Sequence, residues 1–158
     1  MNSLTKKRIE RIRARFDKIK KQTTKEFGKF AKTETLDRFA EALTGSFRMD
    51  YVGDGYYKTV YSKDSVDFVV KIHWGGENDD TGWSRLRFAK DYLKPLFRNR
   101  WISIQPKAAI NLSSQERAYD FFVEKYGDKY LDRYDVHEEN VGYRNGKPVI
   151  FDFENITC

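Results

Sequence analysis

The sequence has a single cysteine, no long apolar run and no repeated or low-complexity segment. The lone Cys158 excludes an internal disulfide and fits a reducing compartment, so we expect a cytoplasmic protein. No window approaches the roughly 18 apolar residues of a membrane-spanning helix, so no membrane partner is expected. The basic N-terminus lacks the apolar segment of a signal peptide. No cysteine–histidine pattern predicts a zinc site.

What the chain does contain is enough apolar material for a folded core. It is 158 residues long, 39% hydrophobic and 16% aromatic, which excludes a disordered protein. This length allows one domain, with room for two small lobes.

The net charge of +6 is concentrated near the N-terminus. Residues 1–32 contain twelve Lys and Arg against three acids, a balance of +9, whereas the remainder has 18 basic and 21 acidic residues. From about residue 4 to 22 the spacing predicts a helix, with one apolar stripe of Ile9, Ile12, Phe16 and Ile19. The helix either docks this stripe on its own domain or serves as a basic arm for an acidic or nucleic-acid partner.

Further helices and strands are predicted from caps and periodicity. Thr33 is expected to cap a second helix that stops at Gly45. Strands are expected between residues 47 and 73 and over 101–106. Ser113 and Glu116 form a capping-box pattern for a helix that ends near Tyr126.

The stretch from residue 134 to 154 concentrates the residues with possible chemistry. Asp135 and Asn140 are five residues apart, the span of a tight loop. Asp152 follows across Asn145-Gly146, a strong hairpin signal, so the hairpin should bring Asn140 and Asp152 together. An amide oxygen beside a carboxylate suits a hard cation such as Mg²⁺. Asp135 would then orient a substrate hydroxyl; the alternative is a surface turn whose polar side chains cap backbone groups.

Residues 135–140 (DVHEEN) resemble the catalytic loop D-x-x-x-x-N of the protein-kinase-like superfamily. Residues 152–154 (DFE) resemble the metal-binding D-F-G that follows it in that superfamily. His137 and Glu154 are closer to the aminoglycoside and choline kinase branch, where D-x-H-x-x-N and D-F-E are usual. The resemblance implies that Asp135 is catalytic and that Asn140 and Asp152 hold the metal, with His137 holding the loop by hydrogen bonds.

An upstream stretch extends the resemblance. Gly53, Gly55 and Val60 resemble the glycine-rich loop G-x-G-x-x-G-x-V, although Lys58 replaces the third glycine. The resemblance implies that the two glycines let backbone N–H groups approach phosphates and that Val60 packs on adenine. Lys71 matches the V-A-I-K lysine, which contacts the α- and β-phosphates. Ordinary turn glycines and a solvent-facing edge lysine are the alternatives.

A helix is predicted over 83–97, where the superfamily has a helix that offers a Glu to the strand lysine. This stretch contains no Glu. Asp91 within it, or Glu77, Asp79 and Asp80 before it, are the acids available to Lys71.

These observations predict an α+β fold: a small kinase-like fold with an antiparallel N-lobe sheet plus one helix, a truncated C-lobe and two extra N-terminal helices. The expected parts are a basic helical segment (1–45), an N-lobe (46–110) and a catalytic-loop lobe (111–158). The resemblance implies an ATP–Mg²⁺ phosphotransferase with an unknown protein or small-molecule acceptor. Alternatives are a non-catalytic kinase-like protein-binding module and a basic-arm nucleic-acid-binding protein on an unrelated fold.

Overall fold

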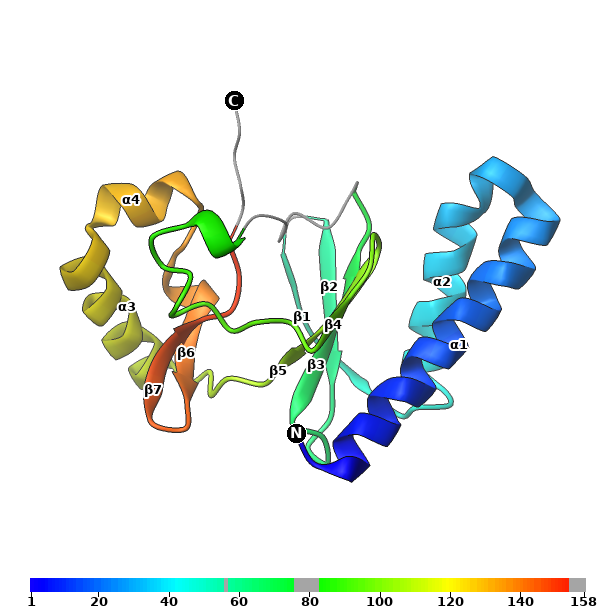
Figure 1. Cartoon of the computed structure of the whole chain (residues 1–158), viewed down its shortest axis with the longest axis horizontal. Coiled ribbons are helices and arrows are strands. Elements are labelled where there is room, and N and C mark those ends of the chain that lie inside the picture. The colour runs from blue at the N-terminus through cyan, green and yellow to red at the C-terminus, as the bar shows by residue number, and fades with distance from the viewer. Residues whose placement is uncertain (56, 76–82, 154–158) are drawn as a thin grey trace. The chain divides into compact units, whose positions relative to one another are not determined.

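Figure 1 shows the computed structural model of the chain, which describes residues 1–55, 57–75 and 83–153. The chain mixes helices and sheet, so the α+β class is confirmed. It divides into two compact units: unit 1 comprises Met1–Glu77 and Leu96–Gln105, and unit 2 comprises Asn78–Pro95 and Pro106–Cys158. Where the sequence predicted a separate segment 1–45, the N-terminal helices share unit 1 with the sheet. Within the described residues, no helix is both long and apolar enough to cross a membrane.

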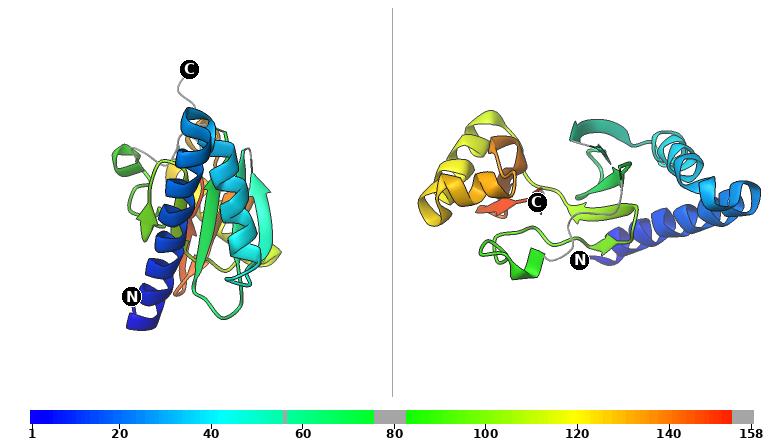
Figure 2. Two further views of the ribbon diagram at one scale, coloured as in Figure 1. Left: turned by 90° about the vertical axis from the view of Figure 1, so that its right-hand side faces the viewer. Right: turned by 90° about the horizontal axis from the view of Figure 1, so that it is seen from above.

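Unit 1 begins with an antiparallel pair of helices, visible side by side in Figure 2. Helix α1 spans Ser3–Phe27, the 3-10 turn η1 spans Gly28–Phe30, and α2 spans Ala31–Thr44. The predicted stripe of α1 is buried against the sheet, which confirms that the helix docks on its own domain. Phe16 packs edge-on against Phe39 and Trp101, with ring centroids 5.1 Å and 6.3 Å away.

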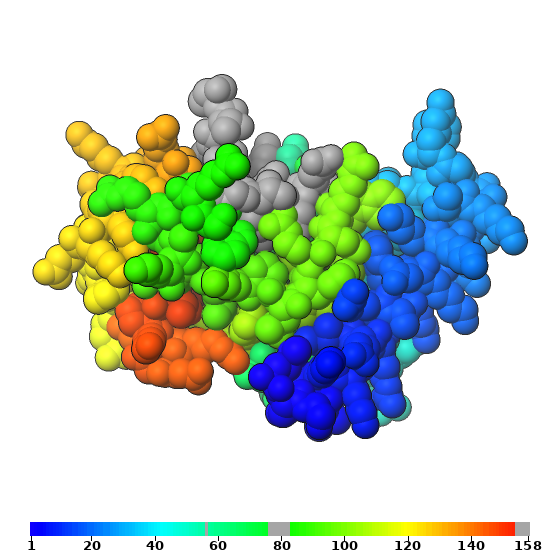
Figure 3. Space-filling view, viewed as in Figure 1, coloured from blue at the N-terminus to red at the C-terminus, as the bar shows by residue number. Residues whose placement is uncertain are grey.

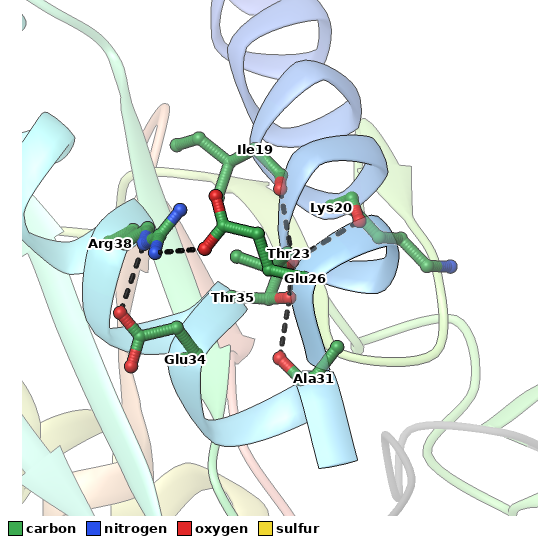
Figure 4. Close-up of polar contacts among 8 residues, drawn as sticks. All are labelled: Ile19, Lys20, Thr23, Glu26, Ala31, Glu34, Thr35 and Arg38. Carbon is green, nitrogen blue, oxygen red and sulfur yellow. Dashed lines mark hydrogen bonds and ion pairs between the residues drawn. The ribbon is translucent and has the colours of Figure 1, made fainter. Parts of the chain in front are cut away.

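Two predicted boundaries in this pair are wrong. Helix α1 runs past residue 22 because the buried Thr23 continues the stripe. Its hydroxyl donates to the Ile19 carbonyl at 3.0 Å and contacts the Thr35 hydroxyl of α2, as Figure 4 shows, so a polar residue takes an apolar position at little cost. Helix α2 begins directly after η1, which places Thr33 inside the helix instead of at its cap. Gly45 ends α2 as predicted.

The sheet of unit 1 has five strands in the order β1-β2-β3-β5-β4. Their bounds are β1 Asp50–Gly55, β2 Lys58–Ser62, β3 Phe68–His73, β4 Phe97–Arg98 and β5 Ile102–Pro106. One face carries the apolar side chains that pack under α1 and α2, among them Val70, Ile72 and Ile104. The opposite face therefore receives the alternate residues of each strand.

Unit 2 contains helices, a hairpin and a non-helical connecting segment. Its elements are η2 Trp83–Arg85, α3 Leu112–Tyr126, α4 Asp128–Arg133, η3 Glu138–Asn140, β6 Val141–Arg144 and β7 Lys147–Ile150. Its core is centred on the fully buried Phe88, whose ring contacts those of Tyr126, Tyr130, Tyr134 and Phe153. Helix α3 is capped by Asn111, whose Oδ1 accepts from the Ser114 N–H at 2.9 Å, so the predicted capping box at Ser113 is wrong.

The predicted helix over 83–97 is also wrong, and the expected single helix beside the sheet is absent from the described part of this stretch. After η2 the chain runs through turns, and Tyr92 forms a parallel bridge with Ile150 of β7. The Leu93 N–H donates to the Ile150 carbonyl and the Ile150 N–H to the Asp91 carbonyl, both at 2.8 Å. Pro95 disfavours helix in the residue before it, and pairing with β7 satisfies these backbone groups instead.

Candidate functional site

The predicted hairpin of unit 2 forms and joins two of the site residues. Asn145 and Gly146 both have positive φ, 52° and 76°, as a two-residue type I′ turn requires. Val141 pairs with Ile150 at the open end, and the Phe151 N–H donates to the Asn140 carbonyl at 2.9 Å. Asn140 therefore lies across from Phe151, the residue before Asp152, so the open end of the hairpin carries both predicted metal residues.

A close backbone contact supports this hairpin from one side. The Ala109 N–H donates to the Tyr143 carbonyl at 2.7 Å, which lays the segment before α3 along β6. A Cβ at Gly142 would lie 2.5 Å from the Ala109 carbonyl oxygen, so only glycine allows this approach. This contact holds the hairpin that follows Asn140 against the segment that precedes α3.

Asn140 and Asp152 present oxygen atoms that are already oriented by the backbone. The Asn140 Oδ1 accepts from the His137 N–H at 3.0 Å, and the Asp152 Oδ1 accepts from the Phe153 N–H at 3.0 Å. Carboxylate and amide oxygens each accept more than one bond, and Mg²⁺ is commonly held by one or two carboxylates together with substrate phosphates. Among the described residues, no group of three or more His, Cys, Asp and Glu forms a fuller metal site. Each of the two side chains thus offers an oxygen of the kind that such a cation takes as a ligand.

Asp135 is held in a conformation that few residues adopt. Its φ is 56°, in the left-handed region, which costs a non-glycine residue about 1–2 kcal/mol. The fully buried Val136 anchors the loop beside it, and the Val136 N–H donates to the Leu131 carbonyl at 2.9 Å. The Asp135 carboxylate stays 43% exposed, with Oδ1 2.7 Å from Nε2 of His137. Aspartate is one of the few residue types that adopt this region in turns, and here the loop presents its carboxylate beside the His137 ring.

In unit 1 the strand register places three predicted cofactor residues in one row. Gly53 pairs with Val60, and Val60 pairs with Lys71. Side chains of directly opposed residues in antiparallel strands lie on the same face, so the row crosses β1, β2 and β3 on the face away from the helices. Gly55, two residues further on, lies on this face as well. A bulge at Val52 shifts the register so that Gly53 joins the row.

The two glycines on this face leave open space above β1. Neither has a positive φ, and a Cβ at Gly53 or Gly55 would meet no atom within 4 Å. The fold of the described chain therefore does not itself require glycine at either position. An approaching ligand would require it, because a side chain would block access to the backbone.

Polar side chains that sequence reasoning missed surround Lys71 on the same face. Lys58 pairs with His73 in the next row, and His73 Nε2 lies 3.1 Å from Ser103 Oγ on β5. Lys71 and Lys58 are only 3% and 6% exposed, and His73, Ser103 and Gln105 are as deeply buried. Buried ammonium groups are favoured only where acceptors or anions surround them. The signal in the sequence was a polar residue at every second position of β-prone runs, as in Lys71-Ile72-His73.

Of the acids predicted as partners of Lys71, only Asp91 lies within the described residues. Asp91 lies in unit 2, where its Oδ2 accepts from Lys125 Nζ at 2.8 Å and from the Tyr126 hydroxyl. The other predicted acids, at 77, 79 and 80, and residue 154 of the D-F-E motif lie outside the described residues.

Comparisons of the chain with protein-family models, with curated proteins and with solved structures find no match.

Proposed function

We propose that the protein is an ATP–Mg²⁺-dependent phosphotransferase with a protein or small molecule as phosphoryl acceptor. In this proposal Lys71 contacts the α- and β-phosphates, and Gly53 and Gly55 let the backbone approach them. Val60 packs on the adenine, Asn140 and Asp152 hold the metal, and Asp135 is the catalytic residue. The basic helix α1 binds an acidic or nucleic-acid partner.

The observation that carries the proposal is the geometry of the loop and hairpin in unit 2. Two residues with metal-type oxygen donors lie at the open end of one hairpin, and a hydrogen-bonded carboxylate lies one short loop before them. A surface turn accommodates an aspartate with a φ of 56°, so what favours the proposal over such a turn is the His137 ring directed at the Asp135 carboxylate, with Nε2 2.7 Å from Oδ1. The row of Gly53, Val60 and Lys71 in unit 1 adds a buried cation beside an open stretch of backbone.

The chemistry assigned to Asp135 is proton removal and alignment. Its carboxylate accepts the proton of the acceptor hydroxyl as that oxygen forms a bond to the γ-phosphorus and the bond to the β,γ-bridging oxygen breaks, so that ADP leaves. His137 keeps the carboxylate oriented through its 2.7 Å contact. Lys58, on the same sheet face as Lys71, adds positive charge for the phosphates. A bound Mg²⁺ would offset the negative charge that develops on them.

The test is a thermal-shift measurement with millimolar ATP–Mg²⁺. A ligand at 100 times its Kd stabilises the native state by about 2.7 kcal/mol, so the wild-type melting temperature should rise by several degrees. Lys71→Ala and Asp152→Ala should each reduce this shift, whereas Lys90→Ala, which removes an exposed lysine, should retain it. A wild-type protein that ATP–Mg²⁺ leaves unchanged would contradict the proposal. Binding without transfer to any acceptor would favour the non-catalytic binding module.

A further inference from the structure

Helix α1 presents a second stripe of side chains opposite its buried one. At 100° per residue, the buried positions 9, 12, 16, 19 and 23 face the core, and the positions opposite them carry Lys7, Arg11, Lys18, Lys21 and Lys25. All five of these basic residues are exposed. From Lys7 to Lys25 the stripe is about 27 Å long at 1.5 Å per residue. Residues of α1, coloured blue in Figure 3, form part of the visible surface of unit 1.

The outer side of α1 stays net positive although two exposed acids, Glu10 and Asp17, lie beside the stripe, because five cations are set against two carboxylates. In the described parts of the chain, none of the five basic residues forms an ion pair. Glu26, near the end of α1, is bound instead by Arg38 of α2 at 2.9 Å, as Figure 4 shows. The outer face of α1 therefore keeps an extended positive potential.

Two aromatic rings are exposed where this stripe ends. Phe27, the last residue of α1, is 44% exposed, and Phe30, the last residue of the η1 turn, is 76% exposed. Lys29 Nζ lies 5.2 Å from the centroid of the Phe30 ring. The turn lies at the end of the helix pair, away from the sheet, in Figure 1 and in the right view of Figure 2. An exposed phenyl ring among lysines offers a flat surface on which a base can stack.

We propose that this face of α1 and the η1 turn bind single-stranded nucleic acid. The five cations would contact successive phosphates, and the Phe30 ring would stack on an unpaired base. A lipid surface is disfavoured because α1 buries its apolar stripe in its own domain. A nucleic acid is favoured over an acidic protein because the cations repeat along the length of the helix with only Ala14 and Gln22 between them, and the exposed apolar side chains, Phe27 and Phe30, lie at one end and not at the centre of this face.

The binding inference is independent of phosphotransfer, because its residues lie on the helix pair and not on the sheet face of Lys71. The first test measures the anisotropy of a fluorescein-labelled 20-nucleotide dT strand between 50 and 200 mM salt. Five phosphate contacts give a slope of log K against log salt of about −3.5 for a single strand. The triple variant Arg11→Ala/Lys18→Ala/Lys25→Ala should reduce this slope to about −1.4.

A matched triple variant shows whether the salt dependence of binding comes from the stripe or only from the net charge of the protein. Lys90→Ala/Lys129→Ala/Lys147→Ala removes the same charge from exposed positions of unit 2 and should leave the slope near −3.5. Equal slopes for the two triple variants would overturn the proposal, as would tighter binding to phosphatidylserine vesicles than to the dT strand.

The second test addresses the aromatic tip. Phe30→Ala should weaken binding to the dT strand by about 5- to 150-fold, the range for the loss of one base-stacking contact. Leu112→Ala, which removes an apolar side chain that is 71% exposed in unit 2, should not change it. If Phe30→Ala binds the strand as tightly as wild type, the single-strand assignment is wrong. The ATP–Mg²⁺ thermal shift of the same variants should stay at the wild-type value, so failure of one proposal is visible without the other.

Discussion

His137 Nε2 lies 2.7 Å from Asp135 Oδ1, and the backbone of the same histidine exchanges hydrogen bonds with Asn140. Its N–H donates to the Asn140 Oδ1 and its carbonyl accepts the Asn140 N–H, both at 3.0 Å. One residue therefore connects a side chain proposed to take a proton with a side chain proposed to hold a metal. In the proposed reaction, these hydrogen bonds would hold both side chains in place, and such preorganisation lowers the cost of forming a reactive arrangement.

Asp135→Asn keeps the shape of this side chain and removes its charge. It should leave ATP–Mg²⁺ affinity nearly intact and lower phosphate transfer by about 10²–10⁴-fold, because an amide does not draw the acceptor's proton. Asp152→Asn should instead weaken metal-dependent nucleotide binding and transfer together. The assay is loss of the γ-phosphate of ATP to water, to the protein or to an acceptor in a host extract.

Asp132 offers a matched control for that experiment. Its carboxylate is 77% exposed and its Oδ1 lies 4.0 Å from His137 Nε2, so Asp132→Asn removes a nearby charge outside the proposed site. It should retain transfer within a few-fold of wild type. Full transfer activity in Asp135→Asn would show that the role given to Asp135 is wrong and that the loop is structural.

His137→Ala tests whether the histidine positions Asp135. A hydrogen bond to a charged group contributes about 1.5–3 kcal/mol, so its loss should lower kcat by about 10- to 150-fold. The KM for ATP should change little, because the metal ligands keep their hairpin. His137→Gln retains a side-chain N–H donor and should recover part of kcat. Equal activities for His137→Ala and His137→Gln would contradict a positioning role.

The features that the sequence predicted correctly are those determined by residues close together in the chain. The Asn145-Gly146 turn, the Gly45 stop and the buried stripe around Phe16 depend on neighbouring residues, and all three are observed. The helix expected at 83–97 failed because its alternative is non-local: the backbone of Asp91 and Leu93 pairs with Ile150, more than fifty residues away.

The same contrast between local and non-local structure holds for the candidate site residues. The loop and hairpin of unit 2 lie within a short stretch of sequence, so their residues were predicted together. The polar sheet face was only partly predicted, because Lys58 and His73 come together with Ser103 through strand register, which spacing alone does not determine. Lys58, a departure from the glycine-rich pattern, thus becomes a further cation on the proposed phosphate-binding face.

Phe16→Ala tests whether α1 is structural. The ring is 1% exposed between α2 and the sheet, so its removal should lower the free energy of unfolding by about 3–5 kcal/mol. Phe30→Ala, which truncates the exposed ring of η1, should change it by no more than about 0.5 kcal/mol. Urea unfolding followed by circular dichroism measures both. A cooperative transition of wild-type stability in Phe16→Ala would mean that unit 1 does not depend on the helix pair.

The cluster of Asp91, Lys125 and Tyr126 gives the protein an alkaline pH dependence. The hydrogen bond that Lys125 donates to the Asp91 carboxylate raises the pKa of Lys125 above its ordinary value. Burial first, and then the hydrogen bond to Asp91, raises the pKa of Tyr126. Both groups thus hold their protons more tightly in the folded chain than in the unfolded one. The stabilisation is complete below the unfolded pKa values and is lost as the pH rises through the folded ones, so the free energy of unfolding should fall above about pH 10.

Asp91→Asn should make this alkaline fall shallower, because it removes the carboxylate that favours protonated Lys125 and neutral Tyr126. Asp37→Asn, at an exposed position of α2, removes an equal charge and should retain the wild-type slope. Urea unfolding at intervals from pH 8.5 to 11 gives the slope for each protein. Tyr119 and Tyr51, whose pKa values are also raised, contribute the same background to all three. If the slope of Asp91→Asn equals that of wild type, the alkaline loss of stability arises elsewhere than in this cluster.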